Sequence, residues 1–232
     1  MATRKKTNTT RGTSKPTLSP AHPLRTPRRA AGGHAVPPQW RSDLCDVLIP
    51  EVQIRRRVQE LARLLTRDYA GKELLIVPLL TGTIMFLADL LRHLTLPLKL
   101  DFMGVSSYRE GTVAREPVIT KELRLEARDR HLLLVDDILD TGRTLACVRE
   151  RLARLGPRSL RTCVLLDKPA RRTQPVQADY VGFVIPDLFV VGYGLDYAER
   201  YRNLPFIGVL HRQFYANPGD STTDQAMRKV EP

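Results

Sequence analysis

Acidic and hydroxyl side chains are concentrated in the stretch DDILDTGRT at residues 136–144. Asp136 and Asp137 come directly after the apolar run LLLV, and adjacent carboxylates at a strand end repel one another unless a cation or hydroxyl groups lie beside them. At Asp140 the chain enters a glycine turn before a predicted helix, where backbone N–H groups and the hydroxyls of Thr141 and Thr144 can bind a phosphate. The stretch therefore predicts a sugar-phosphate site, with carboxylates on ribose hydroxyls and the phosphate on the turn.

Each half of this pattern also has a simpler interpretation. An apolar strand followed by Asp-Asp occurs in receiver-type phosphoacceptor domains, and Thr-Gly at a helix start is a common cap. Asp140 itself could be a helix N-cap. The nine-residue combination is more specific than either half. The chain contains neither GxxxxGK[ST] nor GxGxxG, which excludes a Walker P-loop and a dinucleotide-binding fingerprint.

The flanking sequence predicts the elements that position this stretch. Apolar residues recur at helical spacing over residues 50–71, and LLIVPLL at residues 74–80 is typical of a strand covered on both faces. The pattern continues with a helix at 84–94, a weaker strand at 98–105, a strand at 131–135, a helix to about residue 155 and a strand at 160–166. This alternation predicts an α/β fold with a parallel β-sheet flanked by helices, which binds ligands at the carboxyl ends of its strands.

Two further regions are expected outside that alternation. The polar residues 109–116 contain a glycine and no periodicity, so they predict a mobile loop. The segments 180–184, 189–191 and 206–210 are short, β-rich and separated by turn residues. We expect them to extend the sheet or to form a small β-rich flap or hood.

The charge of the chain is concentrated near its N-terminus. The formal net charge is +12, but residues 1–42 hold nine of the 37 basic side chains and no acidic one, which leaves 28 basic against 25 acidic groups elsewhere. This stretch is rich in Pro, Ser and Thr, and it predicts a disordered basic tail before a domain at 43–216 and a frayed C-terminal tail at 217–232. A solvated tail, non-specific contact with a polyanion and a transit peptide all remain open for residues 1–42.

Composition also limits the class of protein. Cys45, Cys147 and Cys163 are odd in number and far apart, which predicts reduced thiols in a cytoplasmic protein. There is no apolar run long enough to span a membrane and no secretory h-region, so we expect no membrane partner.

With Val135 included, the central stretch resembles the phosphoribosyl-pyrophosphate signature of type I phosphoribosyltransferases. Other segments are similar to the hypoxanthine-guanine branch of that family and follow in its order. LTGTIMFLAD at 80–89 resembles the pyrophosphate loop and its helix, and Ser107-Tyr108 the start of a flexible lid. LLDK at 165–168 and residues 181–196 resemble base-recognition segments, and YRNLP at 201–205 a pyrophosphate-contacting stretch. The resemblance covers about residues 43–214.

The resemblance implies transfer of phosphoribose from 5-phosphoribosyl 1-pyrophosphate to N9 of a 6-oxopurine, hypoxanthine or guanine. It implies that Asp140 is the general base and that Lys168 donates to the purine O6. Other purine contacts implied are stacking on Phe189, the backbone of Val190, and Asp196. Ribose and 5′-phosphate would be bound by Asp136, Asp137, Thr141, Gly142, Arg143 and Thr144.

The same resemblance implies a pyrophosphate site made by Thr81, Gly82 and Arg202, under a lid that includes Ser107 and Tyr108. Mg²⁺ would be bound near Asp136, Asp137 and Asp196. The family often has Lys in place of Thr81, so one cationic contribution to pyrophosphate binding is missing here. A homodimer or homotetramer is also implied.

An RNA-binding regulator built on the same fold is the alternative, with the basic tail as the RNA contact. Such regulators usually carry a non-acidic residue at the position of Asp140, which favours the enzyme. The preference among hypoxanthine, guanine and xanthine is not determined by these residues.

Overall fold

The computed structural model describes residues 24–25, 35–106, 109–110, 113–114 and 117–215. Its main sheet has eight strands in the order β1-β11-β10-β9-β3-β5-β8, with β4 also paired to β3. These strands are β1 (Leu24–Arg25), β3 (Leu74–Leu80), β4 (Leu98–Leu100), β5 (Met103–Ser106), β8 (Val118–Lys121), β9 (His131–Leu139), β10 (Ser159–Asp167) and β11 (Tyr180–Val184). All pairs are parallel except β5 with β8. The predicted α/β fold with a mostly parallel sheet is confirmed.

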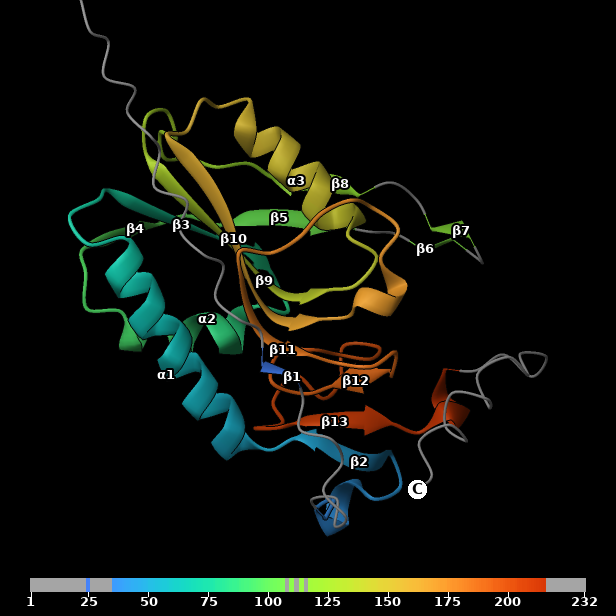
Figure 1. Ribbon diagram of the computed structural model, residues 1–232. Helices are drawn as coiled ribbons and strands as arrows, with labels where there is room; N and C mark the ends of the chain where they lie inside the picture. Colours follow the sequence, from blue (N-terminus) through green and yellow to red (C-terminus); the bar gives the residue numbers. More distant parts are fainter. Residues whose placement is uncertain (1–23, 26–34, 107–108, 111–112, 115–116, 216–232) are drawn as a thin grey trace, which may run out of the picture.

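Three helices cover the sheet: α1 (Glu51–Asp68), α2 (Ile84–His93) and α3 (Arg143–Ala153). Figure 1 shows α1 and α2 on one side of the sheet and α3 on the other. Alternate residues of the strand LLIVPLL pack on opposite faces of the sheet. Leu74 and Ile76 lie in the core under α1 and α2, while Leu75 and Val77 lie in the core under α3. A strand buried on both faces is therefore apolar throughout rather than alternating.

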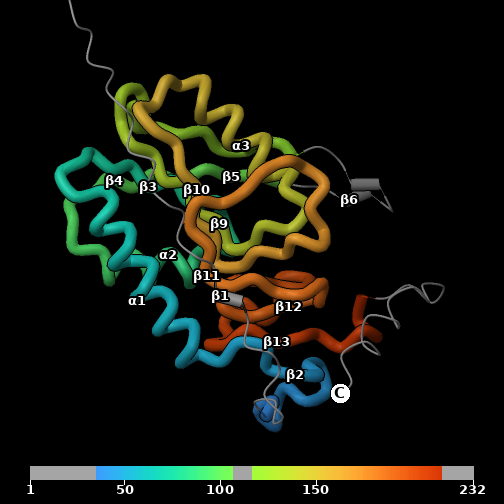
Figure 2. The backbone as a smooth tube through the Cα atoms, in the orientation of Figure 1, coloured from blue at the N-terminus to red at the C-terminus, as the bar shows by residue number. Residues whose placement is uncertain are grey.

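A second, antiparallel sheet forms the predicted hood. It contains β12 (Val190–Val191), β13 (Ile207–Leu210) and β2 (Leu44–Ile49), in that order. The tube in Figure 2 shows β2, an early segment, beside β13, a late one. Leu44 and Val47 pack there against Val191 and Leu204 in a separate small core. The C-terminal part of the chain is thus attached to the segment that leads into α1.

The structure differs from the sequence-based expectations in five places. β2 and β8 were not anticipated, and the single strand expected at 98–105 is divided into β4 and β5. β9 runs four residues beyond the expected end at 135, because β10 continues to pair with it as far as Leu139. The expected loop at 109–116 contains the short antiparallel strands β6 (Arg109–Glu110) and β7 (Val113–Ala114). The two-residue strands β6 and β7 and the four-residue strand β8 have too few residues to show a periodicity.

Part of the expected N-terminal tail is among the described residues. Leu24–Arg25 pairs with β11, and Pro38–Trp40 forms a 3₁₀ helix. The Trp40 ring lies edge-on to Tyr201 at 5.9 Å between centroids. Tyr201 in turn donates a hydrogen bond to Asp43 at 2.9 Å. The rest of residues 1–34 and the expected tail at 217–232 lie outside the described residues, so the division at residue 43 stays a prediction.

No helix within the described ranges is both long and apolar enough to cross a membrane.

Asp101 fixes the turn between β4 and β5 to the chain that follows β8. Its carboxylate accepts backbone hydrogen bonds from Phe102 at 2.8 Å and Leu125 at 2.9 Å, and a third from Arg124. The Lys121 ammonium lies 3.3 Å from the same carboxylate. Burial opposes ionisation, but these donors outweigh it and lower the pKa of Asp101 to about 2. The base of the β5–β8 pair is thereby anchored, at the end opposite the connection that includes the predicted lid.

The low pKa of Asp101 predicts a specific acid dependence of stability. An acid whose pKa falls on folding stabilises the protein above its unfolded pKa, near 4, and loses that contribution as the pH falls toward 2. We expect Asp101→Asn to reduce the free energy of unfolding by about 1–2 kcal/mol at pH 7 and by much less at pH 2.5. Urea unfolding at the two pH values measures this, and an equal loss at both would contradict the assignment.

Candidate functional site

The acid pair lies within the last part of β9 rather than after it. The backbone N–H of Asp137 donates to the Asp136 carboxylate at 3.0 Å, and that of Ile138 donates to the Asp137 carboxylate at 2.8 Å. Burial, reinforced by the neighbouring charge of Asp137, raises the pKa of Asp136 well above its usual range. Burial also raises the pKa of Asp137, although the Arg202 guanidinium opposes this. Such a pair of carboxylates is best stabilised by a bound cation or by hydrogen bonds from hydroxyl groups.

The predicted phosphate turn is present at the start of α3. Gly142 has φ of +86°, a left-handed conformation that places the following N–H groups at the helix N-terminus. A Cβ at this position would lie 2.6 Å from Val176 Cγ1, so glycine is also required for space. Thr141 and Thr144 are both partly exposed beside the turn. A helix N-terminus with adjacent hydroxyls and Arg143 is suited to a phosphate.

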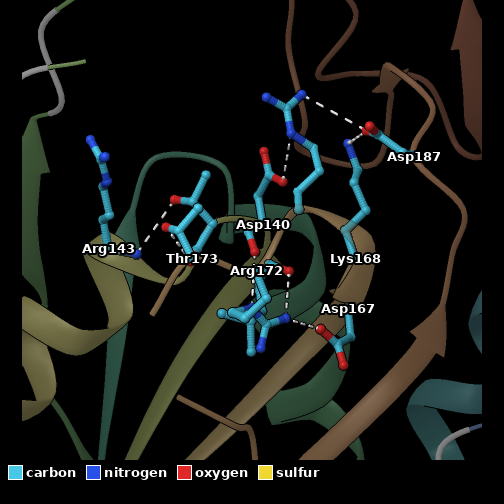
Figure 3. Close-up of polar contacts among 10 residues, drawn as sticks. Asp140, Arg143, Asp167, Lys168, Arg172, Thr173 and Asp187 are labelled. Carbon is cyan, nitrogen blue, oxygen red and sulfur yellow. Dashed lines mark hydrogen bonds and ion pairs between the residues drawn. The ribbon is translucent and has the colours of Figure 1, made fainter. Parts of the chain in front are cut away.

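Arg172 holds this turn from beneath. Figure 3 shows its guanidinium directed at backbone oxygens below Asp140 and at the Asp167 carboxylate. It donates to the carbonyls of Asp140 at 3.0 Å, Val176 at 2.7 Å and Leu139 at 3.2 Å. The backbone N–H of Thr173 adds a bond to the Thr141 carbonyl at 2.9 Å. The segment 172–176 therefore determines the shape of the turn.

Four charged side chains gather beside the turn. Asp140, Lys168 and Asp187 turn their polar ends toward the same region in Figure 3. Lys168 Nζ lies 3.8 Å from Asp187 Oδ1, and the Arg171 guanidinium lies 3.5 Å from Asp140 Oδ1 and 3.8 Å from Asp187 Oδ1. Burial lowers the pKa of Lys168, and the charges of Asp140 and Asp187 oppose that shift. The N–H of Lys168 is also bonded to the Leu139 carbonyl at 3.0 Å, which joins β10 to the end of β9.

The loop after β3 approaches the acid pair closely. A Cβ on Gly82 would lie 1.8 Å from Asp137 Oδ2, so only glycine allows the two to touch. A Cβ on Gly194 would lie 2.0 Å from the Gly82 carbonyl oxygen, which brings the 192–195 turn onto the same loop. Thr81 is exposed there, while Thr83 is buried and its hydroxyl donates to the Leu79 carbonyl. Three separate segments of the chain thus meet at one point.

Arg202 and Asp196 occupy the outer side of this junction. Arg202 donates to the Gly194 carbonyl at 2.9 Å, and its guanidinium lies 3.0 Å from Asp196 Oδ1. The other Asp196 oxygen accepts the backbone N–H of Glu199 at 3.0 Å. Arg202 therefore faces the loop at Gly82 and lowers the energy of negative charge at Asp137.

Phe189 and Val190 come from the hood. Val190 is buried in β12, and Phe189 is partly exposed just before it. The Phe189 ring is stacked on Tyr215, with centroids 4.7 Å apart, and meets the edge of Tyr197 at 5.6 Å. The aromatic cluster holds the Phe189 ring in place, with Tyr215 against one of its faces.

The structure thus gathers the predicted residues into two groups. Asp140 and Lys168 lie together near the phosphate turn, and Gly82, Asp137, Asp196 and Arg202 form a connected set around Gly194. Ser107 and Tyr108 lie outside the described residues. Three charged residues of the site, Arg171, Arg172 and Asp187, were not anticipated. The Arg171-Arg172 pair that follows Lys168-Pro169-Ala170 was the available signal in the sequence.

The described residues contain no group of three or more His, Cys, Asp or Glu side chains that could hold a metal ion. Asp136 and Asp137 form a pair, and Asp196 is already paired with Arg202. A hard cation such as Mg²⁺ can be held by one or two carboxylates together with ligand oxygens and water. The donor set here is of that incomplete kind.

Comparison with known proteins identifies relatives of this chain. Residues 51–198 match the phosphoribosyl transferase domain family. A hypoxanthine phosphoribosyltransferase of Salmonella typhimurium is 49% identical over 166 residues, which cover 70% of this chain and 93% of that protein. A bifunctional TilS/HprT protein of Listeria innocua is 46% identical over 176 residues, and the match spans 75% of this chain but only 27% of that longer protein. A crystal structure of a hypoxanthine phosphoribosyltransferase from Staphylococcus aureus has a TM-score of 0.74 and 44% identity, covering 79% of this chain and all of the other.

The contacts of Arg172 predict a large effect of its removal. Arg172→Ala removes the donor to the carbonyls of Asp140 and Val176 and to the Asp167 carboxylate, and one of the two donors to the Leu139 carbonyl, so we expect a loss of about 2–4 kcal/mol in the free energy of unfolding. Arg151→Ala, which removes an exposed pair with Glu122, is the matched control and should cost less than about 1 kcal/mol. Denaturant unfolding measures both, and equal losses would mean that Arg172 does not support the turn.

Proposed function

The chain belongs to the phosphoribosyltransferase family, and on this basis we propose that it transfers phosphoribose from 5-phosphoribosyl 1-pyrophosphate to N9 of hypoxanthine or guanine. The products are IMP or GMP and pyrophosphate, so the reaction salvages free purines. The observation that carries the choice of substrate is the closeness of Asp140 and Lys168 beside a phosphate-binding turn. A carboxylate and an ammonium at that place match the ring N–H and the O6 of a 6-oxopurine.

Asp140 is the proposed general base. Its Oδ1 atom is buried and accepts no hydrogen bond from the described part of the chain, while the side chain as a whole is partly exposed, so the carboxylate can accept a purine N–H. The proton leaves the purine as N9 forms its bond to the ribose C1. The Arg172 bond to the Asp140 carbonyl holds the backbone while the carboxylate remains available.

Lys168, Phe189, Val190 and Asp196 are the proposed purine contacts. Lys168 is 5% exposed, and a buried ammonium donates to O6 but would face the amino group of adenine with no acceptor. Phe189 would stack on the base and is held by Tyr197 and Tyr215. The backbone at Val190, fixed in β12, would read the far edge of the ring, with Asp196 close by.

The remaining predicted residues are proposed to bind the sugar diphosphate. Asp136 and Asp137 would accept the ribose hydroxyls, and Thr141, Gly142, Arg143 and Thr144 would hold the 5′-phosphate at the start of α3. Thr81, Gly82 and Arg202 would hold pyrophosphate, and Arg202 would stabilise the charge that grows as the bond to C1 breaks. Ser107 and Tyr108 are proposed as lid residues that exclude water.

Mg²⁺ is the proposed cofactor. The adjacent carboxylates Asp136 and Asp137, each with a raised pKa, fit a hard cation, and Asp196, which is paired with Arg202, is the third proposed contact. When bound, Mg²⁺ supplies positive charge to the pyrophosphate and ribose oxygens. We further propose, from the family resemblance, a homodimer or homotetramer in the cytoplasm.

An RNA-binding regulator is the other candidate function. The relatives described above are enzymes by name, and they do not support that alternative. Non-specific contact of the basic residues 1–42 with a polyanion remains compatible with the enzyme.

A spectrophotometric assay of the full chain tests the proposal. We expect nucleotide formation from hypoxanthine and guanine with 5-phosphoribosyl 1-pyrophosphate, reversible loss of turnover when Mg²⁺ is chelated, and no turnover of adenine. Xanthine is assayed in parallel to establish the range of substrates. Absence of turnover with all of these 6-oxopurines, together with salt-sensitive RNA binding, would support the regulator instead.

Replacing the proposed base should affect chemistry more than binding. Asp140→Asn keeps the size of the side chain but not the ability to take a proton, so we expect kcat to fall by roughly 100-fold or more with a modest change in purine KM. Steady-state kinetics with hypoxanthine measures both constants. Near-normal turnover would mean that Asp140 is not the general base; the alternative of a helix N-cap is already wrong, because the N-cap of α3 is Gly142.

Replacing the proposed O6 donor should affect binding selectively. We expect Lys168→Ala to weaken 6-oxopurine binding by about 1–3 kcal/mol, because a charge-assisted hydrogen bond is lost. Lys99→Ala, an exposed lysine on β4, is the control. The KM values for hypoxanthine and for the phosphoribosyl donor are compared. An equal rise in both would point to general disruption of the site rather than loss of an O6 contact.

A further inference from the structure

A short 3₁₀ helix places an arginine beside the proposed general base. Residues Pro169–Arg171 form this turn directly after Lys168, and the backbone N–H of Arg171 bonds to the Lys168 carbonyl at 3.2 Å. The turn reverses the chain so that the Arg171 guanidinium reaches back over the end of β9. Its Nε lies 3.5 Å from Asp140 Oδ1.

Arg171 is held between two acids. While Nε faces Asp140, the Nη1 atom lies 3.8 Å from Asp187 Oδ1, and Lys168 Nζ lies 3.8 Å from that same oxygen. Lys168, Asp187, Arg171 and Asp140 therefore form a chain of alternating charge. Each cation lies next to an acid, and the Arg171 guanidinium has an acid on either side. The position of the guanidinium is therefore restricted.

The contact with Asp140 is electrostatic and does not use up the carboxylate. Asp140 Oδ1 is buried but lacks a hydrogen bond from any described residue, even though Arg171 is 3.5 Å away. A cation at that distance attracts the negative charge of the carboxylate by Coulomb interaction. The Asp140 side chain as a whole is partly exposed, so the carboxylate can still be reached by a donor on a ligand.

We propose that Arg171 is a positioning residue for Asp140, orienting its carboxylate toward the purine N–H and stabilising its negative charge before proton transfer. The inference rests on the proposed function, since it takes Asp140 as the general base. Arg172 does not perform this task, because its guanidinium bonds to the Asp140 backbone and to Asp167. Lys168 faces Asp187 and is the proposed donor to the purine.

The surroundings of Arg171 indicate that its role is functional rather than structural. Its side chain is 46% exposed, and exposed ion pairs contribute little to stability. Replacing it should therefore leave the fold unchanged, in contrast to Arg172.

A double-mutant cycle tests whether Arg171 acts through Asp140. We expect Arg171→Gln to lower the single-turnover rate of nucleotide formation by about tenfold, with little change in KM for the phosphoribosyl donor. Arg171→Lys should recover much of that rate because it restores the charge. In the Asp140→Asn background, Arg171→Gln should have no further effect. Arg154→Gln, which removes an exposed pair with Glu150 on α3, is the matched control.

Three results would overturn the inference. These are an Arg171→Gln rate within about twofold of the wild type, an equal further loss in the Asp140→Asn background, or a large rise in donor KM, which would mean that Arg171 binds the donor directly. Thermal unfolding of each variant checks that the fold is kept. The proposed function fails separately, if the unmodified chain shows no turnover of any 6-oxopurine.

Discussion

Concentrated negative charge at the carboxyl end of β9 is the constraint on which the site depends. Asp136, Asp137 and Asp140 lie within five residues, and burial makes the ionised forms of the consecutive pair Asp136 and Asp137 costly. Cationic side chains from other segments of the chain compensate this negative charge. Arg202 faces Asp137 from the hood side, while Lys168 and Arg171 approach the Asp140 side from the end of β10. The proposed sugar-diphosphate substrate and Mg²⁺ would complete the compensation.

Close backbone approach is the second requirement. Gly82 touches Asp137, Gly194 touches Gly82, and Gly142 sits against Val176 and Arg172, at distances that no Cβ would permit. These contacts join the loop after β3, the turn before α3 and the hood into one surface. Within the hood, β13 pairs with β2, the strand that leads into α1. The N-terminal side of the domain therefore determines where the hood lies relative to the main sheet.

Local patterns predicted most of the main sheet and its helices. LLIVPLL indicated a strand buried on both faces, and the helical spacing after residue 50 indicated α1. The strands β2 and β8 were not predicted, because their extended conformation is set by pairing with β13 and β5 rather than by a periodicity of their own residues. The length of β9 was underestimated for a similar reason, since its last residues are strand because β10 pairs with them.

The sequence by itself determined the acid pair, the phosphate turn, the order of the elements and the family resemblance, because each is encoded in neighbouring residues. Only the tertiary structure decided which distant side chains reach those residues. Arg171, Arg172 and Asp187 are ordinary surface-type residues in the sequence, and they face Asp140 or Lys168 only after β10 pairs with β9 and the chain turns back at Pro169. Charge compensation depends on distance in space, and distance between segments is set by packing rather than by the local pattern.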